Sequence, residues 1–578
     1  MKKYTIDNIN INDLMLRIGE NEKQVFVTAS ATNDGWGNLI AWNPVEIFDF
    51  NSNNPNETVK QLDDFIVRQQ LLGRRVAGFE TYDFGCSLHE VKIKKTSEKS
   101  FPDYLAYSFE NWISFDDSKA TVHYSDISFK NKVENILSRS SRILGNDLYS
   151  SPLQPIQSRQ WYESSYKKIK NYIKSGDVYQ VNLTHPLSGK TQMSGRDLFA
   201  SLHLESKVDF QSYIEVDGFE IISFSPERFI QVNENMIKTS PIKGTRERGY
   251  NLDLDEELRY DLENNPKDMA ELNMITDLLR NDLGKICKVG SVQVVEKRTL
   301  REYPTLWHAH STITGILVDN ISPISALSSM MPGGSITGCP KKRAIEIIDE
   351  LEPANRGLYT GSIFVVDEKG NLDSSIAIRT MIKNINNLLL SVGGGVVNDS
   401  NEADEYQESL DKAKSFIDVT SNITSSDVLE SQFGPIKIEI LYQVDSTRVI
   451  ATKTIYSEKV LELSLVEFIK SGVDTYPEIH KEILLGKSIG KAFKDSGIEF
   501  YRNTHHEYKS ILYDKIQNIF TSDRPSNVVD VTINVGPNRI PYARILETYS
   551  PDVIWASKIS QLTDIDTEKI KKLDELIR

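Results

Sequence analysis

A short polar stretch near residue 425 divides this sequence into two parts of unequal length. The stretch runs from Asn422 to Asp427, and its composition is typical of a linker. Strand-like and helix-like segments precede it. After it, alternating apolar and polar residues from Ile436 to Ile440 predict a half-buried strand. We therefore expect a separate unit of domain size over residues 430–578.

The part before the linker changes character near residue 150. Residues 1–150 contain short runs of β-forming residues separated by turns. Residues 151–422 alternate strands with amphipathic helices, whose apolar residues recur at helical spacing. The predicted helices cover residues 160–175, 268–283, 341–351 and 402–417, and a buried strand over 388–392 is predicted to end at three consecutive glycines.

The composition excludes several classes of protein. The chain has 578 residues, a formal net charge of -15 and three widely separated cysteines, Cys86, Cys287 and Cys339. Such cysteines favour isolated thiols over a disulfide framework or a zinc site. An acidic chain makes a poor nucleic-acid binder, although a locally basic pocket can hold a small anion. No long apolar run occurs and the first residues lack a signal-peptide core, so we expect a cytoplasmic protein with no membrane segment.

Lys243 is the first candidate catalytic residue. Proline and glycine in the stretch Pro241–Thr245 predict a rigid turn that another group can approach closely. A desolvated lysine that loses its proton is a nucleophile, but most turn lysines are simply exposed. Glu227 could act as a general acid if burial raises its pKa. Its alternative is a simple ion pair with Arg228 or Arg246.

Two further carboxylates lie on predicted helices. Glu271 is on the helix over 268–283, and Glu408 is on the helix over 402–417. Two carboxylates brought together with water and a substrate oxygen suit Mg²⁺. Lys412 follows Glu408 by four residues, so both lie on one helix face. Solvated helix charges and a surface ion pair are the alternatives at these positions.

Three features can bind an anion. The run Gly393–Gly395 exposes backbone N–H groups if it ends the strand, and the turn Gly338–Pro340 precedes a helix N-terminus. Arg379 is a cation within an apolar strand-like segment, where it needs an anionic partner. That partner is either a substrate carboxylate, held bidentately, or an internal acid. Together with the acids and Lys243, these features suit a small dicarboxylate substrate.

Six stretches between residues 155 and 420 stand in a fixed order, and a seventh lies near the N-terminus: Ser175–Leu183, Ser225–Phe229, Pro241–Thr245, Thr276–Gly284, Pro332–Lys341, Glu405–Glu408 and Gly78–Gly85. Together they resemble the chorismate-utilising enzymes, and above all the aminodeoxychorismate synthase branch of that family. The resemblance implies an α+β fold, in which a large two-sheet β-sandwich is flanked by helices and followed by a smaller α+β domain. Residues 151–422 would be its catalytic region.

Two positions distinguish the branches of this family. Relatives that make isochorismate or salicylate use a lysine base where this chain has Gln180, and anthranilate synthases usually have alanine at the position of Lys243. The resemblance therefore implies amination of chorismate to 4-amino-4-deoxychorismate. Lys243 would attack the ring while Glu227 protonates the departing hydroxyl, and ammonia would then displace the lysine. His308 matches the family's active-site histidine, and Cys339 stands where alanine is common.

The resemblance also implies the binding residues. Mg²⁺ is expected on Glu271 and Glu408. The expected contacts of the substrate and its carboxylates are Arg379, Lys412, Gly393, Gly394, Gly395, Thr245 and Thr337.

The nitrogen source and the exact reaction stay open at this level. Cys86 does not stand in the Gly-x-Cys-x-Gly elbow of a glutaminase, so we expect either free ammonia or a separate glutamine amidotransferase subunit. An anthranilate-type or aminodeoxyisochorismate synthase is one alternative. A non-catalytic, chorismate-binding regulatory subunit is another, against which the intact set of Lys243, Glu227, Glu271 and Glu408 speaks.

The unit after the linker resembles chorismate lyase-like proteins over residues 448–508. In that family a buried glutamate acts as an acid and arginines hold carboxylates, and the matching candidates are Glu547, Arg448 and Arg502. His480 and Lys481 stand where an arginine pair is expected. An active lyase would remove pyruvate from the aminated intermediate and yield 4-aminobenzoate, a precursor of folate. A merely structural unit is the alternative.

Overall fold

The computed structural model describes residues 1–420, apart from 8, 20, 33–34, 51–53, 90, 92–100, 117–118, 140–149, 207, 250–251 and 304–305, together with residues 436–444, 447–455, 528–535 and 540–544. The chain divides into two compact units. The first comprises residues 1–142 and 148–422, and the second comprises 143–147 and 423–578. Strands from before and after residue 150 share the two large sheets of the first unit.

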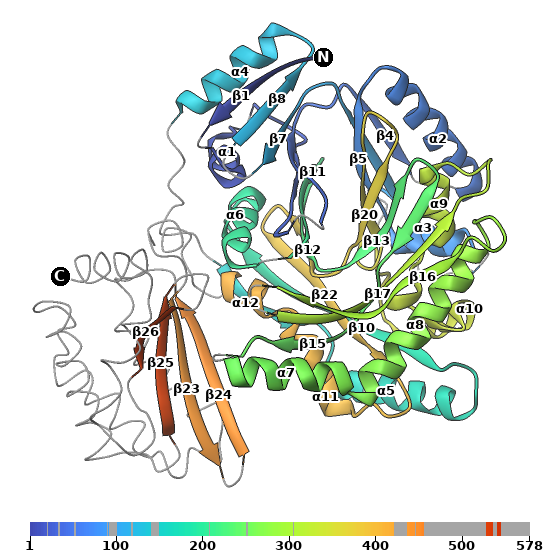
Figure 1. The fold of residues 1–578 in the computed structure, drawn as a ribbon, viewed down its shortest axis with the longest axis vertical. Helices are drawn as coiled ribbons and strands as arrows, with labels where there is room; N and C mark the ends of the chain where they lie inside the picture. Colours follow the sequence, from blue (N-terminus) through green and yellow to red (C-terminus); the bar gives the residue numbers. More distant parts are fainter. Residues whose placement is uncertain are drawn as a thin grey trace, which may run out of the picture. The chain divides into compact units, whose positions relative to one another are not determined.

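The larger sheet contains twelve strands among the described residues, and neighbouring strands are antiparallel (Figure 1). In spatial order they are β1 (Lys2–Asp7), β8 (Lys119–Tyr124), β7 (Trp112–Asp116), β3 (Asn38–Ala41), β2 (Phe26–Ala29), β11 (Phe210–Val216), β12 (Phe219–Ser225), β21 (Thr380–Asn384), β22 (Asn387–Val396), β10 (Gln180–Thr191) and β18 (Gly338–Cys339), with β9 (Ser150–Pro155) also paired to β10.

The second sheet contains ten strands within the same described ranges. Their order is β15 (Ile242–Glu247), β17 (Leu306–Ile316), β14 (Met236–Thr239), β13 (Arg228–Asn233), β20 (Leu372–Ile376), β19 (Ser362–Val366), β5 (Arg75–Glu80), β6 (Tyr104–Phe109) and β4 (Glu46–Phe50), with β16 (Gln293–Glu302) paired to β17. Two large antiparallel sheets with helices around them confirm the predicted α+β class.

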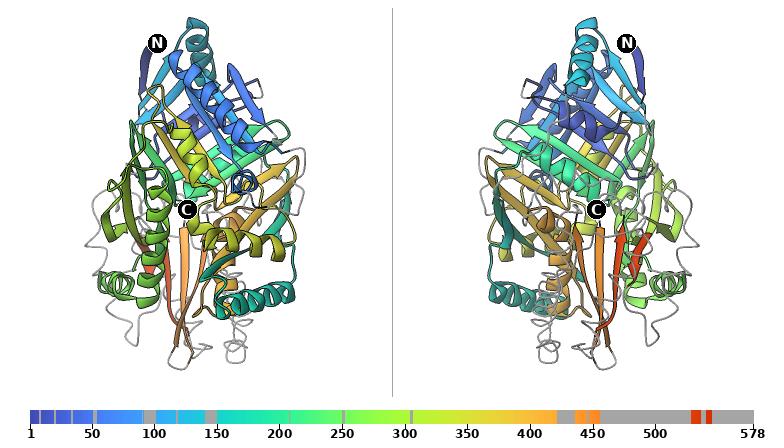
Figure 2. Two further views of the ribbon diagram at one scale, coloured as in Figure 1. Left: turned by 90° about the vertical axis from the view of Figure 1, so that its right-hand side faces the viewer. Right: turned by 90° about the vertical axis from the view of Figure 1, so that its left-hand side faces the viewer.

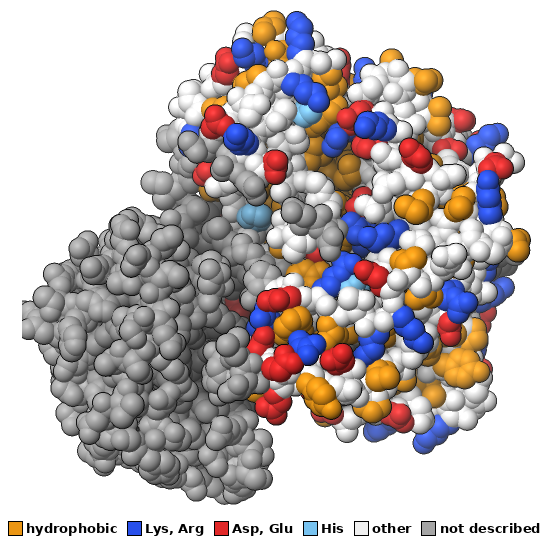
Figure 3. Space-filling view, in the orientation of Figure 1, with side chains coloured by type: hydrophobic (Ala, Val, Ile, Leu, Met, Phe, Trp, Pro, Cys, Tyr) orange, Lys and Arg blue, Asp and Glu red, His pale blue; other side chains and the backbone are white. Residues whose placement is uncertain are grey.

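Twelve α-helices of the described chain accompany the sheets: α1 (Ile11–Arg17), α2 (Pro55–Leu71), α3 (Tyr82–Ser87), α4 (Ile127–Ser138), α5 (Arg159–Lys174), α6 (Gly195–Glu205), α7 (Leu252–Asn264), α8 (Pro266–Gly284), α9 (Pro323–Met330), α10 (Lys341–Leu351), α11 (Glu402–Asp411) and α12 (Lys414–Thr420). Figure 2 shows them around the outside of the sheets, where α2 packs against α9, β4 and β5. On the face in Figure 3, acidic and basic side chains are interspersed over the described residues.

The pleat of the strands divides the apolar residues among separate cores. On β5, Val76 packs with the helices outside the second sheet, whereas Ala77 and Phe79 face the first sheet. On β2, Phe26 belongs to the core between the sheets, and Val27 packs with helices on the opposite face. Because successive strand residues point to opposite faces, both sheets are buried on both sides at their centres.

The amphipathic pattern located most of the predicted helices correctly. Helix α10 has the predicted bounds, and α8 begins after the Asn265 side chain, which accepts hydrogen bonds from the first-turn amides. The single helix predicted over 402–417 is wrong, because α11 ends at Asp411 and α12 begins at Lys414. The intervening Lys412 directs its ammonium to the carbonyl of Gly393, 3.0 Å away.

The chain crosses between the two sheets at two corners that matter for the site. Pro226 and Glu227 connect β12 to β13, and residues 377–379 connect β20 to β21. The Ile376 amide donates to the Glu227 carbonyl at 3.1 Å, and the Phe224 amide donates to the Arg379 carbonyl at 2.9 Å. The predicted position of Arg379 inside a strand is therefore wrong. It occupies a corner, with a φ of +48°.

In the second unit, the described residues form a four-stranded antiparallel sheet. Its order is β24 (Thr447–Ile455), β23 (Ile436–Val444), β25 (Val528–Val535) and β26 (Ile540–Arg544). Arg448 lies on β24, whereas Arg502 and Glu547 lie outside the described residues. Across the described parts of the chain, no helix has the length and apolar character needed to cross a membrane.

Candidate active site

Lys243 lies on β15, at an irregularity in its pairing with β17. Ile242 pairs with His310 and Thr245 pairs with His308, so the register shifts at the two residues between them. The predicted turn is therefore a bulge within a strand. Gly244 has a φ of +85°, and a Cβ there would lie 2.8 Å from a methyl carbon of Leu262. Glycine thus permits both the bulge and the close approach of the neighbouring helices.

Glu227 is buried at the first corner, where burial raises its pKa to about 6. The rise is partly offset by the positive charges of Lys243 and Lys412 and by a hydrogen bond from Ser335, each of which lowers this pKa. The arginines that were the alternative partners of Glu227 bind other acids. Arg228 binds Asp373 bidentately at 2.9 and 3.0 Å, and Arg246 pairs with Asp261 and Asp268. Glu227 is therefore a carboxyl that can hold a proton near neutral pH.

Lys243 lies within electrostatic range of three carboxylates. Its charge lowers the pKa values of Glu227, Glu271 and Glu408. For Glu271, burial outweighs this effect and raises the pKa. For Glu408, burial is outweighed by Lys412, whose ammonium lies 2.9 Å away, and by Lys243, so the pKa is lowered. The structure thus brings together two predicted metal-binding acids, the predicted acid and the predicted nucleophile.

The residues predicted to bind carboxylates adjoin this group. Arg379 forms no ion pair with any described carboxylate, and burial lowers its pKa. Gly393–Gly395 do not end the strand as predicted, because they belong to β22 and pair with residues 182–184 of β10. Their lack of side chains makes space instead. A Cβ on Gly394 would lie 3.2 Å from a carboxylate oxygen of Glu405, and one on Gly395 would lie 2.6 Å from the Gln180 amide nitrogen.

Three other candidates lie in different surroundings. His308 is buried, and burial together with the charge of Arg379 lowers its pKa to about 3, so its ring is neutral. Its Nδ1 lies 2.8 Å from the hydroxyl of Thr245, an exposed residue. Thr337 is buried and donates its hydroxyl to the Gly333 carbonyl at 2.8 Å, which orders the loop before β18.

Gln180 is the last of these candidates, at the start of β10. Its side chain is buried, and neither amide atom has a hydrogen-bond partner among the described residues. Buried polar groups normally have partners, so this amide is free to bond with a ligand or with water.

The geometry of the site agrees with a family assignment. The profile of the family described as chorismate binding enzyme matches residues 23–418. The chain belongs to this family. Most of the first unit lies within the match, which includes every candidate residue of the site described above.

Named relatives of this chorismate-utilising enzyme fall into more than one branch. Aminodeoxychorismate synthase component 1 of Klebsiella aerogenes is 35% identical over 58% of this chain and 74% of the relative. Anthranilate synthase component 1 of Lactococcus lactis is 30% identical over 72% of this chain and 99% of the relative. The crystal structure of anthranilate synthase component I from Streptococcus pneumoniae has a TM-score of 0.55 at 25% identity, and the match covers 72% of this chain and 92% of that one.

A fourth carboxylate beside this candidate site escaped the sequence interpretation. Glu405 is buried on α11 and accepts a hydrogen bond from the Ser400 hydroxyl at 2.7 Å. Lys267 lies between it and Glu271, with ammonium-to-oxygen distances of 3.6 and 3.9 Å. A sequence signal did exist, because Glu405 precedes Glu408 by one helical turn and stands in the same family stretch.

Glu271 and Glu408 are the carboxylates expected to hold Mg²⁺. In the described part of the chain, no group of three acidic, histidine or cysteine side chains has the arrangement of a metal site. Mg²⁺ is commonly held by only one or two carboxylates, with waters and substrate oxygens completing the shell. Glu271 and Glu408, whose pKa values are both lowered by the charge of Lys243, would provide two such carboxylates.

Proposed function

We propose that this chorismate-utilising enzyme aminates chorismate at C4 and forms 4-amino-4-deoxychorismate. One observation carries the proposal: a lysine, Lys243, lies on the bulge of β15 within electrostatic range of Glu227, a buried acid whose pKa is about 6. An enzyme that used ammonia directly would not need a nucleophile at this position. A lysine beside a protonatable acid suits a two-step substitution with a covalent intermediate.

The residues can divide the chemistry as follows. Once solvent has taken its proton, the Lys243 amine would form a bond to a ring carbon, and the ring unsaturation would shift as the C4–O bond breaks. Glu227 donates its proton to the departing hydroxyl, which leaves as water. Ammonia then attacks C4, the double bond shifts back and the lysine amine leaves. The spare proton of the ammonia returns to a base, and the Glu227 carboxylate, ionised in the first step, lies close by.

Binding groups would orient the substrate for this reaction. Glu271 and Glu408 would hold Mg²⁺, which supplies positive charge for a substrate carboxylate. Arg379 and Lys412 would bind carboxylates directly, together with the amides of Gly393–Gly395 that β10 leaves free. The hydroxyl of Thr245, which contacts His308, and the loop ordered by Thr337 would also contribute to substrate binding. The neutral His308 ring would donate or accept a hydrogen bond without adding charge.

The partners follow from the proposed reaction. Ammonia would come from solution or from a separate glutamine amidotransferase subunit, in keeping with the word component in the names of the relatives. The match to anthranilate synthase component 1 of Lactococcus lactis covers 99% of that relative. This match supports an anthranilate-type reaction as the second candidate. For the unit after residue 430, pyruvate elimination by Glu547, Arg448 and Arg502 stays a separate proposal.

Product analysis tests the proposal directly. Purified protein is incubated with chorismate, Mg²⁺ and an ammonium salt, and the products are identified by mass spectrometry and chromatography. We expect 4-amino-4-deoxychorismate, or 4-aminobenzoate if the second unit is active. Anthranilate as the main product would refute the proposal in favour of the second candidate, and no turnover would support a regulatory subunit.

A lysine substitution tests the nucleophile. In the Lys243→Ala variant without ammonia, a covalent adduct with chorismate should be absent from the intact-protein mass spectrum, whereas the wild type should show one. Lys285→Ala is the matched control, because Lys285 pairs with Asp282 on α8 outside the group around Lys243. An adduct that persists in Lys243→Ala would show that another residue attacks.

A further inference from the structure

A lysine in the first turn of α8 contacts acids on two different helices. The ammonium of Lys267 lies 3.9 Å from a carboxylate oxygen of Glu271 on α8 and 3.6 Å from one of Glu405 on α11. The side chains of Glu271 and Glu405 are 20% and 6% exposed, whereas that of Lys267 is 49% exposed. A half-exposed ammonium therefore bridges two carboxylates that are mostly buried.

The position of this lysine is unfavourable for the helix itself. The first turn of a helix carries a partial positive charge, because its first backbone N–H groups have no partner within the helix. An acid stabilises such a turn, as Asp268 does in α8, whereas a cation destabilises it. Residues that oppose a local preference are commonly found at functional sites. We therefore attribute the presence of Lys267 to its contacts with the two acids.

The same acids are part of the proposed Mg²⁺ site. Glu271 and Glu408 are the proposed ligands, and Mg²⁺ needs carboxylate oxygens at roughly 2.1 Å in nearly ideal octahedral geometry. A cation already paired with the carboxylate repels the metal. Glu271 is paired with Lys267, and the ammonium of Lys412 lies 2.9 Å from an oxygen of Glu408. Each proposed ligand of the metal therefore has a lysine as its partner in the structure.

The two lysines differ in how firmly they are held. Lys412 also donates to the Gly393 carbonyl at 3.0 Å and is proposed to bind a substrate carboxylate. The distances from Lys267 to its two acids exceed that of a hydrogen bond, and its side chain is half exposed. Exposed ion pairs contribute little net free energy. The ammonium of Lys267 can therefore move into solvent when a divalent cation enters.

We propose that Lys267 is an internal counter-ion that competes with Mg²⁺ for Glu271 and so lowers the Mg²⁺ affinity of the free enzyme. The proposal rests on the assignment of Glu271 and Glu408 as the Mg²⁺ ligands in the proposed function. Without the metal, the ammonium neutralises charge on Glu271 and Glu405. When Mg²⁺ binds, the ammonium turns into solvent, and Glu405 remains as a nearby negative charge that attracts the metal.

Calorimetric titration of the full chain with MgCl₂, in the absence of chorismate and ammonia, tests the proposal. Lys267→Met removes the competing charge. We expect its dissociation constant for Mg²⁺ to be lower than that of the wild type by roughly tenfold, because the metal no longer displaces an ion pair. Lys267→Arg keeps the charge, so its dissociation constant should stay within about twofold of the wild-type value.

A lysine at the C-terminal end of α8 provides the matched control. Lys285 pairs with Asp282 at 2.9 Å and is 62% exposed. Lys285→Met changes the net charge of the chain by the same amount, but the dissociation constant for Mg²⁺ should stay within about twofold, because salt screens distant surface charges. If Lys267→Met does not fold, as judged by circular dichroism, Lys267→Gln takes its place.

The outcomes separate this proposal from the proposed function. An unchanged or weaker Mg²⁺ affinity in Lys267→Met would refute the competition, because the ammonium would then not oppose the metal. Equal tightening in Lys267→Met and Lys285→Met would also refute it, since the net charge of the chain would be the cause. If neither the wild type nor Lys267→Met binds Mg²⁺, both the competition and the proposed metal ligands are wrong. The identity of the wild-type product, measured independently, decides the amination reaction.

Discussion

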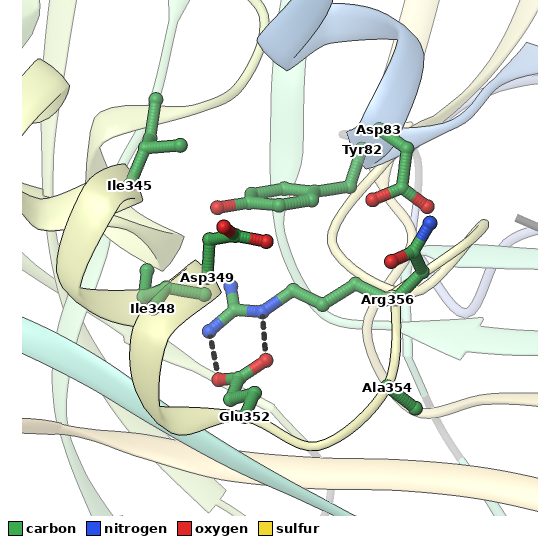
Figure 4. Close-up of a pocket in the computed structure, with 9 residues that line it drawn as sticks. Tyr82, Asp83, Ile345, Ile348, Asp349, Glu352, Ala354 and Arg356 are labelled. Carbon is green, nitrogen blue, oxygen red and sulfur yellow. Dashed lines mark hydrogen bonds and ion pairs between the residues drawn. The ribbon is translucent and has the colours of Figure 1, made fainter. Parts of the chain in front are cut away.

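Arg356 lies between α10 and β19, and Arg379 lies between β20 and β21, but only Arg356 has a described carboxylate partner, Glu352 (Figure 4). Arg356 is enclosed by a carboxylate, backbone carbonyls and an aromatic ring, whereas Arg379 has no carboxylate partner among the described residues. A desolvated cation without a partner costs free energy. Proteins tolerate this loss of folding free energy at ligand-binding sites, where the ligand supplies the missing partner. The first arginine therefore has a structural role, and the second is available to an anion.

The largest expected effect is on stability, in the fully paired segment. Arg356→Met should lower the free energy of unfolding by about 3–5 kcal/mol, because it leaves the Glu352 charge buried without a partner. Urea unfolding followed by circular dichroism measures the change. The double variant Glu352→Met/Arg356→Met should recover much of the loss, since both charges are then absent. A double variant as unstable as the single one would contradict this account.

Removal of the unpaired arginine should affect binding instead. Arg379→Gln should raise the KM for chorismate on the order of 30- to 100-fold, the loss expected for a charged hydrogen-bonding group. Steady-state kinetics measures it. The free energy of unfolding should not fall, because the substitution breaks no described ion pair and removes a desolvated charge. If Arg379→Gln strongly lowered the free energy of unfolding and left KM unchanged, Arg379 would have a structural role like that of Arg356.

Glu227 should behave like Arg379 and destabilise the folded state at neutral pH. Its pKa rises from 4.5 to about 6 on folding, so its contribution to stability is present below pH 4.5 and is lost as the pH rises through 6. Glu227→Gln should therefore stabilise the protein by roughly 2 kcal/mol at pH 8 and have little effect at pH 4. Denaturant titrations of both proteins at pH 4 and pH 8 measure this change in the free energy of unfolding. If Glu227→Gln had the same effect at both pH values, the pKa of Glu227 would not be raised in the folded protein.

Local sequence patterns predicted the helices well and the irregular positions poorly. The apolar spacing and the Asn265 cap locate α8 because they are local signals. At the break between α11 and α12, Lys412 binds the Gly393 carbonyl of a distant strand, a contact that leaves no local signal in the sequence. The sequence pattern placed the glycines of β22 at the end of a strand. In the structure they lie within the strand, where the lack of a Cβ leaves room for neighbouring side chains such as that of Gln180.

The candidate site was predictable from motifs, but its supports were not. Lys243, Glu227, Glu271 and Glu408 stand in stretches that resemble a known family, and the structure brings them together. Arg356 lies in a loop without periodicity, and its contacts with residues 182 and 336 depend on tertiary structure alone. Only the folded chain shows why a charged residue is buried at that position.

The two corners between the sheets have a mechanical consequence. Glu227 and Arg379 lie on connections between the two sheets. The amide of Ile376, at the end of β20, donates to the Glu227 carbonyl, and the amide of Phe224, near the end of β12, donates to the Arg379 carbonyl. Lys243, by contrast, belongs to a strand of the second sheet alone. A small shear of one sheet over the other would therefore move the acid and the arginine together and change their separation from the lysine. Such sliding would alter the reaction distance while the acid and the arginine keep their spacing.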